Sequence, residues 1–202
     1  MRFVCSTNEQ CQEVHHTMAK RVMNVLECAR AVWMAVHGTL LGLMRNNSLS
    51  PNDVDMDVDL AVSESWFKDI STSSNPIFHT IKAMGYHLFV DPGSDDTIIR
   101  VCLGHGFPGV QEDTVDRSPY YDHYKFLDIF KLTQKSSASK GNEVVIFEYE
   151  YPEEHIFPLR SIDFNDSTIP IPAHPEFMLT KLYGNWTVVL RTLHGNFSKS
   201  KA

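Results

Sequence analysis

Aspartate recurs at every second position in one short segment, which contains Asp53, Asp55, Asp57 and Asp59. An apolar residue follows each aspartate, so a strand here would place four carboxylates on one face and apolar side chains on the other. Carboxylates this close repel one another unless a cation neutralises them. Hard oxygen ligands favour magnesium, manganese or calcium over zinc. The segment therefore predicts a divalent-metal site.

Two other parts of the sequence supply what a two-metal phosphoryl or nucleotidyl transfer site needs. Such a site uses two carboxylates on one strand and a third from a neighbouring strand. Asp128 is the single acid in the apolar stretch 126–132 and is the candidate for the third position. Gly38 and Thr39 form a small turn before a short helix, where backbone N–H groups could bind phosphate oxygens.

Two alternative interpretations of the aspartate segment are less favoured. In a calcium-binding loop of the EF-hand type, Asp53 would be position one and Glu64 position twelve, but position six needs glycine and is Val58. In a solvated edge strand the acids would only block edge pairing, although natural edges generally use lysine or mixed charges.

Length and charge exclude several function classes. A chain of 202 residues suits one domain with its own core. A net charge of −7 argues against sequence-independent nucleic-acid binding, and with it against a nucleotide-adding polymerase, which would need a basic groove. No apolar run approaches the roughly 18 residues of a membrane span. The cysteines lack metal-site spacing, and Cys28 and Cys102 are expected in the core.

The elements expected to position these residues alternate between helix and strand. A capping box at Thr7 and Gln10 predicts a first helix, and Thr39 is the expected N-cap of a helix over 40–45. Further helices are expected at 63–70, 75–84 and 175–183. Strands are expected at 31–36, 53–62, 86–90, 97–103, 126–132, 143–149, 162–164 and 169–171. Loop 104–123 and polar turn 133–142 connect them, and the order indicates an α+β domain with a mixed sheet.

Several segments resemble the LicD and fukutin-related family of phosphotransferases. They are Gly38-Thr39-Leu40-Leu41-Gly42-Leu43-Met44-Arg45, Asp57-Val58-Asp59-Leu60-Ala61-Val62, Leu127-Asp128-Ile129-Phe130, Ile156-Phe157-Pro158-Leu159, Ile169-Pro170-Ile171-Pro172 and Leu182-Tyr183-Gly184. They keep the family order from the first helix to Trp186, which is more specific than any single motif. The resemblance implies a nucleotidyltransferase-like fold, similar to the palm of DNA polymerase β, in one domain over 1–202 with a core of about 8–186.

The same resemblance implies an activity and its site residues. Members move a phospho-alcohol, such as phosphocholine or ribitol phosphate, from a CDP-activated donor to a glycan or glycoprotein acceptor, with release of CMP and with Mg²⁺ or Mn²⁺ as cofactor. By position, Asp57 and Asp59 match the paired metal ligands, Asp128 the third carboxylate, and Gly38 and Thr39 the phosphate turn. Alignment on the preceding proline makes the pair Asp55 and Asp57 instead. The continuing apolar strand favours Asp57 and Asp59.

Other candidates carry two interpretations each. Arg45 could reach phosphate oxygens or serve a surface role. Arg100 and Lys125 could bind the donor, although solvated charges are the more frequent case. His37 is expected to be buried and hydrogen-bonded rather than a catalytic base. Aromatic residues of the loop could stack on cytosine or a sugar, or simply pack: Tyr120, Tyr121 and His123.

The remaining alternative function is a calcium-binding or catalytically silent module that binds carbohydrate or nucleotide. The resemblance is compatible with a Golgi or secretory location, where members generally carry a membrane anchor. No anchor is visible in this sequence. Of the sites for N-glycosylation, Asn46 lies beside the proposed site, where a glycan would obstruct it.

Overall fold

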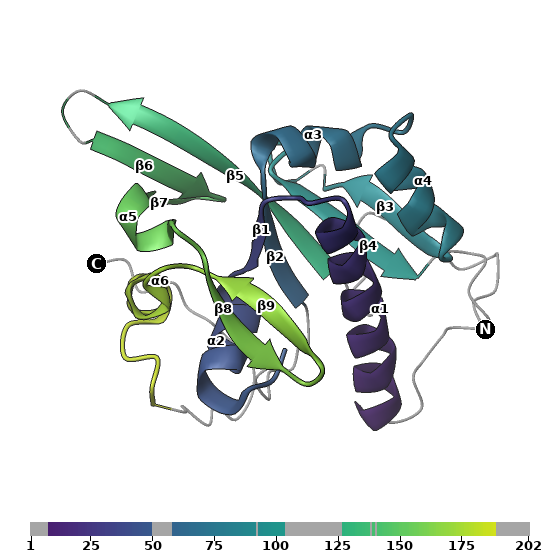
Figure 1. Ribbon diagram of the computed structural model, residues 1–202, viewed down its shortest axis with the longest axis horizontal. Helices are drawn as coiled ribbons and strands as arrows, with labels where there is room; N and C mark the ends of the chain where they lie inside the picture. Colours follow the sequence, from purple (N-terminus) through teal and green to yellow (C-terminus); the bar gives the residue numbers. More distant parts are fainter. Residues whose placement is uncertain are drawn as a thin grey trace.

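The computed structural model describes residues 8–49, 58–91, 93–103, 127–137, 139 and 141–188. Figure 1 shows its elements, which follow one another as α1 (Asn8–Cys28), β1 (Trp33–Ala35), α2 (His37–Asn46), β2 (Val58–Ser63), α3 (Glu64–Ser71), α4 (Pro76–Ala83), β3 (Tyr86–Val90), β4 (Ile98–Leu103), β5 (Leu127–Ser137), β6 (Gly141–Ile146), β7 (Tyr149–Pro152), α5 (Glu153–Ile156), β8 (Arg160–Phe164), β9 (Ser167–Ile171) and α6 (Pro175–Tyr183).

One mixed sheet organises the molecule. Its main strands run in the order β1-β2-β5-β4-β3, and β6 and β7 continue from β5. The pair β2 and β5 is parallel, whereas the other pairs are antiparallel. The predicted α+β mixed sheet with flanking helices is confirmed. Because β2 lies between β1 and β5, the interpretation of this strand as an acidic edge is wrong.

Helices α1, α3 and α4 pack against the sheet and against one another. On α1 the buried residues Met18, Val22 and Leu26 recur every four positions, which places them on one helix face. The central strands meet them with fully buried side chains such as Leu60 and Ile129. Burial of this apolar surface holds the sheet rigid where it carries the polar residues of the site.

A smaller part of the fold follows the main sheet in the chain. Strands β8 and β9 form an antiparallel hairpin that contacts β1, and α6 contacts both α2 and α5. In Figure 1 this hairpin and α6 lie on the same side of the molecule as α2. Helix α2 is therefore held between the main sheet and the C-terminal elements.

Three predictions of local structure away from α2 are wrong. The polar segment 133–142 is not a turn, because β5 continues to Ser137 and β6 begins at Gly141. The single strand expected over 143–149 is split between β6 and β7 by a tight turn, in which Phe147 has a φ of 55°. Cys28, expected in the core, is exposed, whereas Cys102 is buried as predicted.

The start of the first helix, including Thr7, lies outside the described residues, as does loop 104–123. Among the helices that the structure describes, none combines the length and the apolar character needed to cross a bilayer.

Candidate metal and phosphate site

Asp59 and Asp128 lie at directly paired positions on adjacent strands. In the parallel register of β2 and β5, Asp59 is opposite Asp128. Side chains at paired positions point to the same face, and neighbouring strands are about 4.8 Å apart. Asp128 is only 9% exposed. Two of the predicted carboxylates, from two strands, therefore converge at one position on the sheet.

Helix α2 fixes the position of Asp59. The Gly38 N–H donates to Asp59 Oδ2 at 2.9 Å, and the Asp59 N–H donates to Thr39 Oγ1 at 2.8 Å. Thr39 is fully buried inside the first turn of α2, which begins at His37, so its prediction as an N-cap is wrong. Its hydroxyl instead holds the backbone of β2, and the helix N-terminus attracts the carboxylate.

Glycine at residue 38 leaves room for the close approach of the Asp59 carboxylate. A Cβ atom at Gly38 would lie 3.1 Å from Asp59 Oδ2, which is tighter than ordinary contact. The absence of a side chain lets the backbone N–H reach the carboxylate. The turn expected to bind phosphate therefore makes at least one contact within the site, to Asp59.

His37 begins α2 in a strained conformation. Its φ is 44°, a left-handed value that costs a non-glycine residue about 1 kcal/mol or more. Its ring packs edge-on against Phe130, with 4.5 Å between ring centroids. Burial lowers the pKa of His37 to about 4, so the ring is neutral at pH 7. The ring is packed as predicted, but its buried Nε2 has no hydrogen-bond partner among the described residues.

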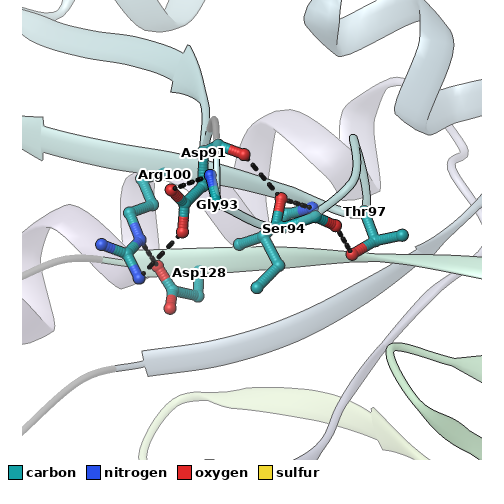
Figure 2. A network of polar contacts seen from close by, with 7 residues as sticks. Asp91, Gly93, Ser94, Thr97, Arg100 and Asp128 are labelled. Atoms are coloured by element: carbon teal, nitrogen blue, oxygen red, sulfur yellow. Dashed lines mark hydrogen bonds and ion pairs between the residues drawn. The ribbon is translucent and has the colours of Figure 1, made fainter. Parts of the chain in front are cut away.

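Arg100 brings a positive charge to this carboxylate pair. Its Nη2 lies 3.1 Å from Asp91 Oδ2, and its Nε lies 3.6 Å from Asp128 Oδ1 (Figure 2). The solvated-charge interpretation of Arg100 is therefore wrong, and the structure places it in an ion-pair network. The residue pattern alone does not single out Asp91 as a site residue. The signal for it was the turn between the two predicted strands, where Asp91 is the last residue before Pro92.

Arg45 points to a different part of the molecule. It donates to the backbone carbonyls of Trp186 and Val188, which follow α6. These contacts join α2 to the C-terminal segment and favour an anchoring role. Phosphate binding by Arg45 remains a prediction.

The remaining candidates fall outside the part of the chain that the structure describes: Asp53, Asp55, Asp57, Tyr120, Tyr121, His123 and Lys125. The calcium-loop interpretation is nevertheless wrong. Val58, its sixth position, begins a buried strand of six residues, where the loop needs a glycine in a sharp turn. An EF-hand loop cannot contain a strand of this length.

The donor atoms suit a hard divalent cation. Asp59 and Asp128 supply carboxylate oxygens side by side, the ligand type that Mg²⁺ and Mn²⁺ prefer. Within the described ranges, no group of three or more acidic, histidine or cysteine side chains could hold a metal. A third protein ligand would therefore come from outside these ranges, and Asp57 is placed two residues before Asp59 in the sequence.

Comparisons with known proteins bear on the whole domain. A search of curated proteins found no significant match. Among solved structures, a lincomycin-bound lincosamide antibiotic adenylyltransferase, LnuA, is 11% identical, with 78% of this chain and 79% of that chain covered and a TM-score of 0.41. The family profile described as LicD/FKTN/FKRP, nucleotidyltransferase domain, matches residues 30–174. This match spans β1 to the residue before α6 and includes both paired aspartates, and the chain therefore belongs to the LicD/FKTN/FKRP nucleotidyltransferase-domain family.

Proposed function

We propose that this protein transfers a phospho-alcohol, of the phosphocholine or ribitol phosphate class, from a CDP-activated donor to a glycan hydroxyl and releases CMP. The observation that carries the proposal is the direct pairing of Asp59 with Asp128 across β2 and β5. Membership of the family supports a transferase, and the carboxylate pair supports a reaction at a phosphate group.

The proposed cofactor is Mg²⁺ or Mn²⁺, with Asp59, Asp128 and Asp57 as its protein ligands and Asp55 as the alternative to one of them. Such a cation supplies charge neutralisation at the donor diphosphate. Asp59 is already oriented by Gly38 and Thr39, so little ordering would accompany binding. Preorganised ligands of this kind lower the cost of assembling a site.

The proposed reaction is an in-line displacement at phosphorus. The acceptor oxygen forms a bond to the phosphorus of the phospho-alcohol, and the bond from that phosphorus to the CMP oxygen breaks. The hydroxyl proton passes to Asp128 or to another base, and CMP leaves with the bonding electron pair. Gly38 and Thr39 act in this scheme by holding Asp59 in the geometry that the donor requires.

The direct test measures ligand-dependent stability and then turnover. We expect CDP-ribitol or CDP-choline to raise the melting temperature of the protein when Mg²⁺ or Mn²⁺ is present, because ligands that bind only the folded state stabilise it. The Asp59→Asn variant should lose this shift, and wild type should release CMP in the presence of a suitable glycan.

Two results would point elsewhere. A shift with ATP or RNA but not with CDP-alcohols would indicate a nucleotide-adding enzyme. A metal-dependent shift with CDP-alcohols, but no CMP release across a broad panel of glycan acceptors, would indicate the catalytically silent binding module.

A further inference from the structure

Three charged side chains form a row across three adjacent strands. Arg100 of β4 is paired with Asp128 of β5, which is paired in turn with Asp59 of β2. Paired positions share one face of the sheet, so the three side chains lie next to one another in this order. The Arg100 guanidinium therefore lies next to Asp128, on the side away from Asp59.

Arg100 is shared unequally between two acids. Its 3.1 Å contact with Asp91 is at hydrogen-bond distance, whereas its 3.6 Å contact with Asp128 is longer than a hydrogen bond. Of these two contacts, the one with Asp91 is therefore the stronger. The charge of Arg100 acts on Asp128, but the 3.6 Å contact between them is not a short bidentate ion pair that would compete strongly with a metal for the carboxylate.

The turn between β3 and β4 holds Asp91 in place (Figure 2). The Gly93 N–H donates to Asp91 Oδ1 at 3.1 Å, which leaves Oδ2 directed at Arg100. Ser94 donates from its N–H at 3.1 Å and from its hydroxyl at 2.8 Å to the Asp91 carbonyl. The Ser94 hydroxyl also accepts from the Ile98 N–H at 3.1 Å, and the Thr97 hydroxyl donates to the Ser94 carbonyl.

We propose that Arg100 positions Asp128 and acts as an internal counter-ion, which a bound metal replaces. The ion pair with Asp91 keeps Arg100 in place when the metal binds. This inference rests on the proposed function. Without metal, the charge of Arg100 offsets the repulsion between Asp59 and Asp128. When a divalent cation binds these carboxylates, Arg100 is repelled but keeps its shorter contact with Asp91. The ion pair with Asp91 therefore limits how strongly Arg100 competes with the cation.

The proposal predicts opposite effects for the two members of the ion pair. Arg100→Gln removes a positive charge next to the site and should tighten Mn²⁺ binding by on the order of tenfold. The same variant should lower kcat, because Asp128 loses the group that orients it. Asp91→Asn should weaken Mn²⁺ binding several-fold, because Arg100 then turns to Asp128. A purely structural role for Arg100 would reduce metal affinity and turnover together.

The test uses Mn²⁺ alone with the full chain, and the free ion is measured by electron paramagnetic resonance. Arg160→Gln and Asp163→Asn are matched controls, because they make the same charge changes on β8, which belongs to the separate hairpin. Both should bind Mn²⁺ as wild type does. In the Arg100→Gln background, Asp91→Asn should have a much smaller effect than in wild type, because the coupling runs through Arg100.

The possible results separate this inference from the proposed function. If wild type binds no Mn²⁺, the proposed function and the inference both fail. If wild type binds Mn²⁺ and Asp59→Asn does not, but Arg100→Gln binds it equally or more weakly, the inference alone is overturned. Should Arg100→Gln not fold, the Asp91→Asn arm decides: weaker binding supports the counter-ion, and unchanged or tighter binding contradicts it.

Discussion

The two halves of β5 differ in their surroundings: the first half is part of the central sheet and carries a site residue, and the second half forms an exposed hairpin. The first half, Leu127–Leu132, lies between β2 and β4, and its side chains are largely buried, with Asp128 among them. The second half, from Thr133 to Ser137, pairs with β6 and extends from the sheet as a long hairpin, at the upper left of Figure 1.

The two halves are stabilised by different forces. Apolar burial and two flanking strands hold the first half, so the register of its one acid is fixed. The second half depends on its backbone ladder and on exposed polar pairs, such as Gln134 Nε2 to Glu153 Oε1 at 2.8 Å and Lys135 to Glu150 at 3.8 Å. Exposed pairs of this kind contribute about 1 kcal/mol or less. Only the first half can hold a charge rigidly enough for chemistry.

The largest expected effect is on turnover when either paired aspartate loses its charge. Asp59→Asn and Asp128→Asn keep the side-chain shape but remove the negative charge proposed to hold the metal. We expect CMP release to fall by on the order of a thousandfold or more, with the free energy of unfolding changed by only about 1 kcal/mol. Ser136→Ala, in the second half of the same strand, is the control and should retain full turnover.

A second effect comes from crowding the Asp59 carboxylate. In Gly38→Ala the new methyl group would lie 3.1 Å from Asp59 Oδ2 and displace it. The carboxylate must then give by a few tenths of an ångström, and we expect turnover to fall by about tenfold, since a misplacement of about 1 Å costs about a hundredfold. Gly141→Ala, at the start of β6, is the contrasting variant. Its φ of 81° disfavours a side chain, but no atom lies within 4 Å, so stability should fall while turnover is kept.

The comparison of the two halves also explains what the sequence could predict. The convergence of the aspartate strand with Asp128 was predictable, because the acids are flanked by apolar residues that specify a buried strand and its facing side. Which aspartate lies opposite Asp128 was not predictable, because a period of two fits Asp55, Asp57 and Asp59 equally well. The segment from Thr133 to Ser137 was predicted as a turn, since Thr, Gln, Lys and Ser also form turns. Its hydrogen bonds to β6 depend on tertiary pairing, which local composition does not encode.

The ion pair of Arg100 with Asp91 was beyond prediction for a similar reason. Arg100 was recognised as a candidate near the site, but its partner is at the end of another strand and is aimed by the fold of a turn. The buried role of Thr39 was also missed. A threonine hydroxyl is equally suited to cap a helix N-terminus. Only the packing of α2 on β2 directs this hydroxyl to the Asp59 N–H.

The next effect is a pH dependence of stability that arises at His37. Burial lowers its pKa from 6.5 to about 4, so between these values the unfolded chain binds a proton that the folded chain does not. His37 therefore destabilises the fold progressively as pH falls through this window. Between pH 7.5 and pH 5 the loss should be about 2 kcal/mol.

Denaturant unfolding of wild type and His37→Asn at both pH values measures this effect. Asparagine accepts the left-handed backbone at this position and does not titrate. The stability difference between the two proteins should shift by about 2 kcal/mol in favour of the variant at pH 5. A constant difference would show that His37 keeps an ordinary pKa in the folded protein.

The smallest expected effect is in the exposed hairpin. Glu153 accepts hydrogen bonds from Gln134 and from Asn142 Nδ2, the latter at 2.9 Å. Because these groups are exposed, Glu153→Ala should cost less than about 1 kcal/mol in chemical denaturation and should not alter turnover. A loss of several kcal/mol would mean that the hairpin, rather than the central sheet, limits stability.

The central claim is that Asp59 and Asp128 together bind a divalent cation. Crystals soaked in Mn²⁺ and a CDP-alcohol, with data collected for anomalous scattering, test it most directly. If both aspartates hold the cation, an anomalous peak should lie between the two strands, with carboxylate oxygens of both aspartates about 2.0–2.3 Å away. A peak elsewhere, or an ordered donor bound with no metal at these residues, would contradict it.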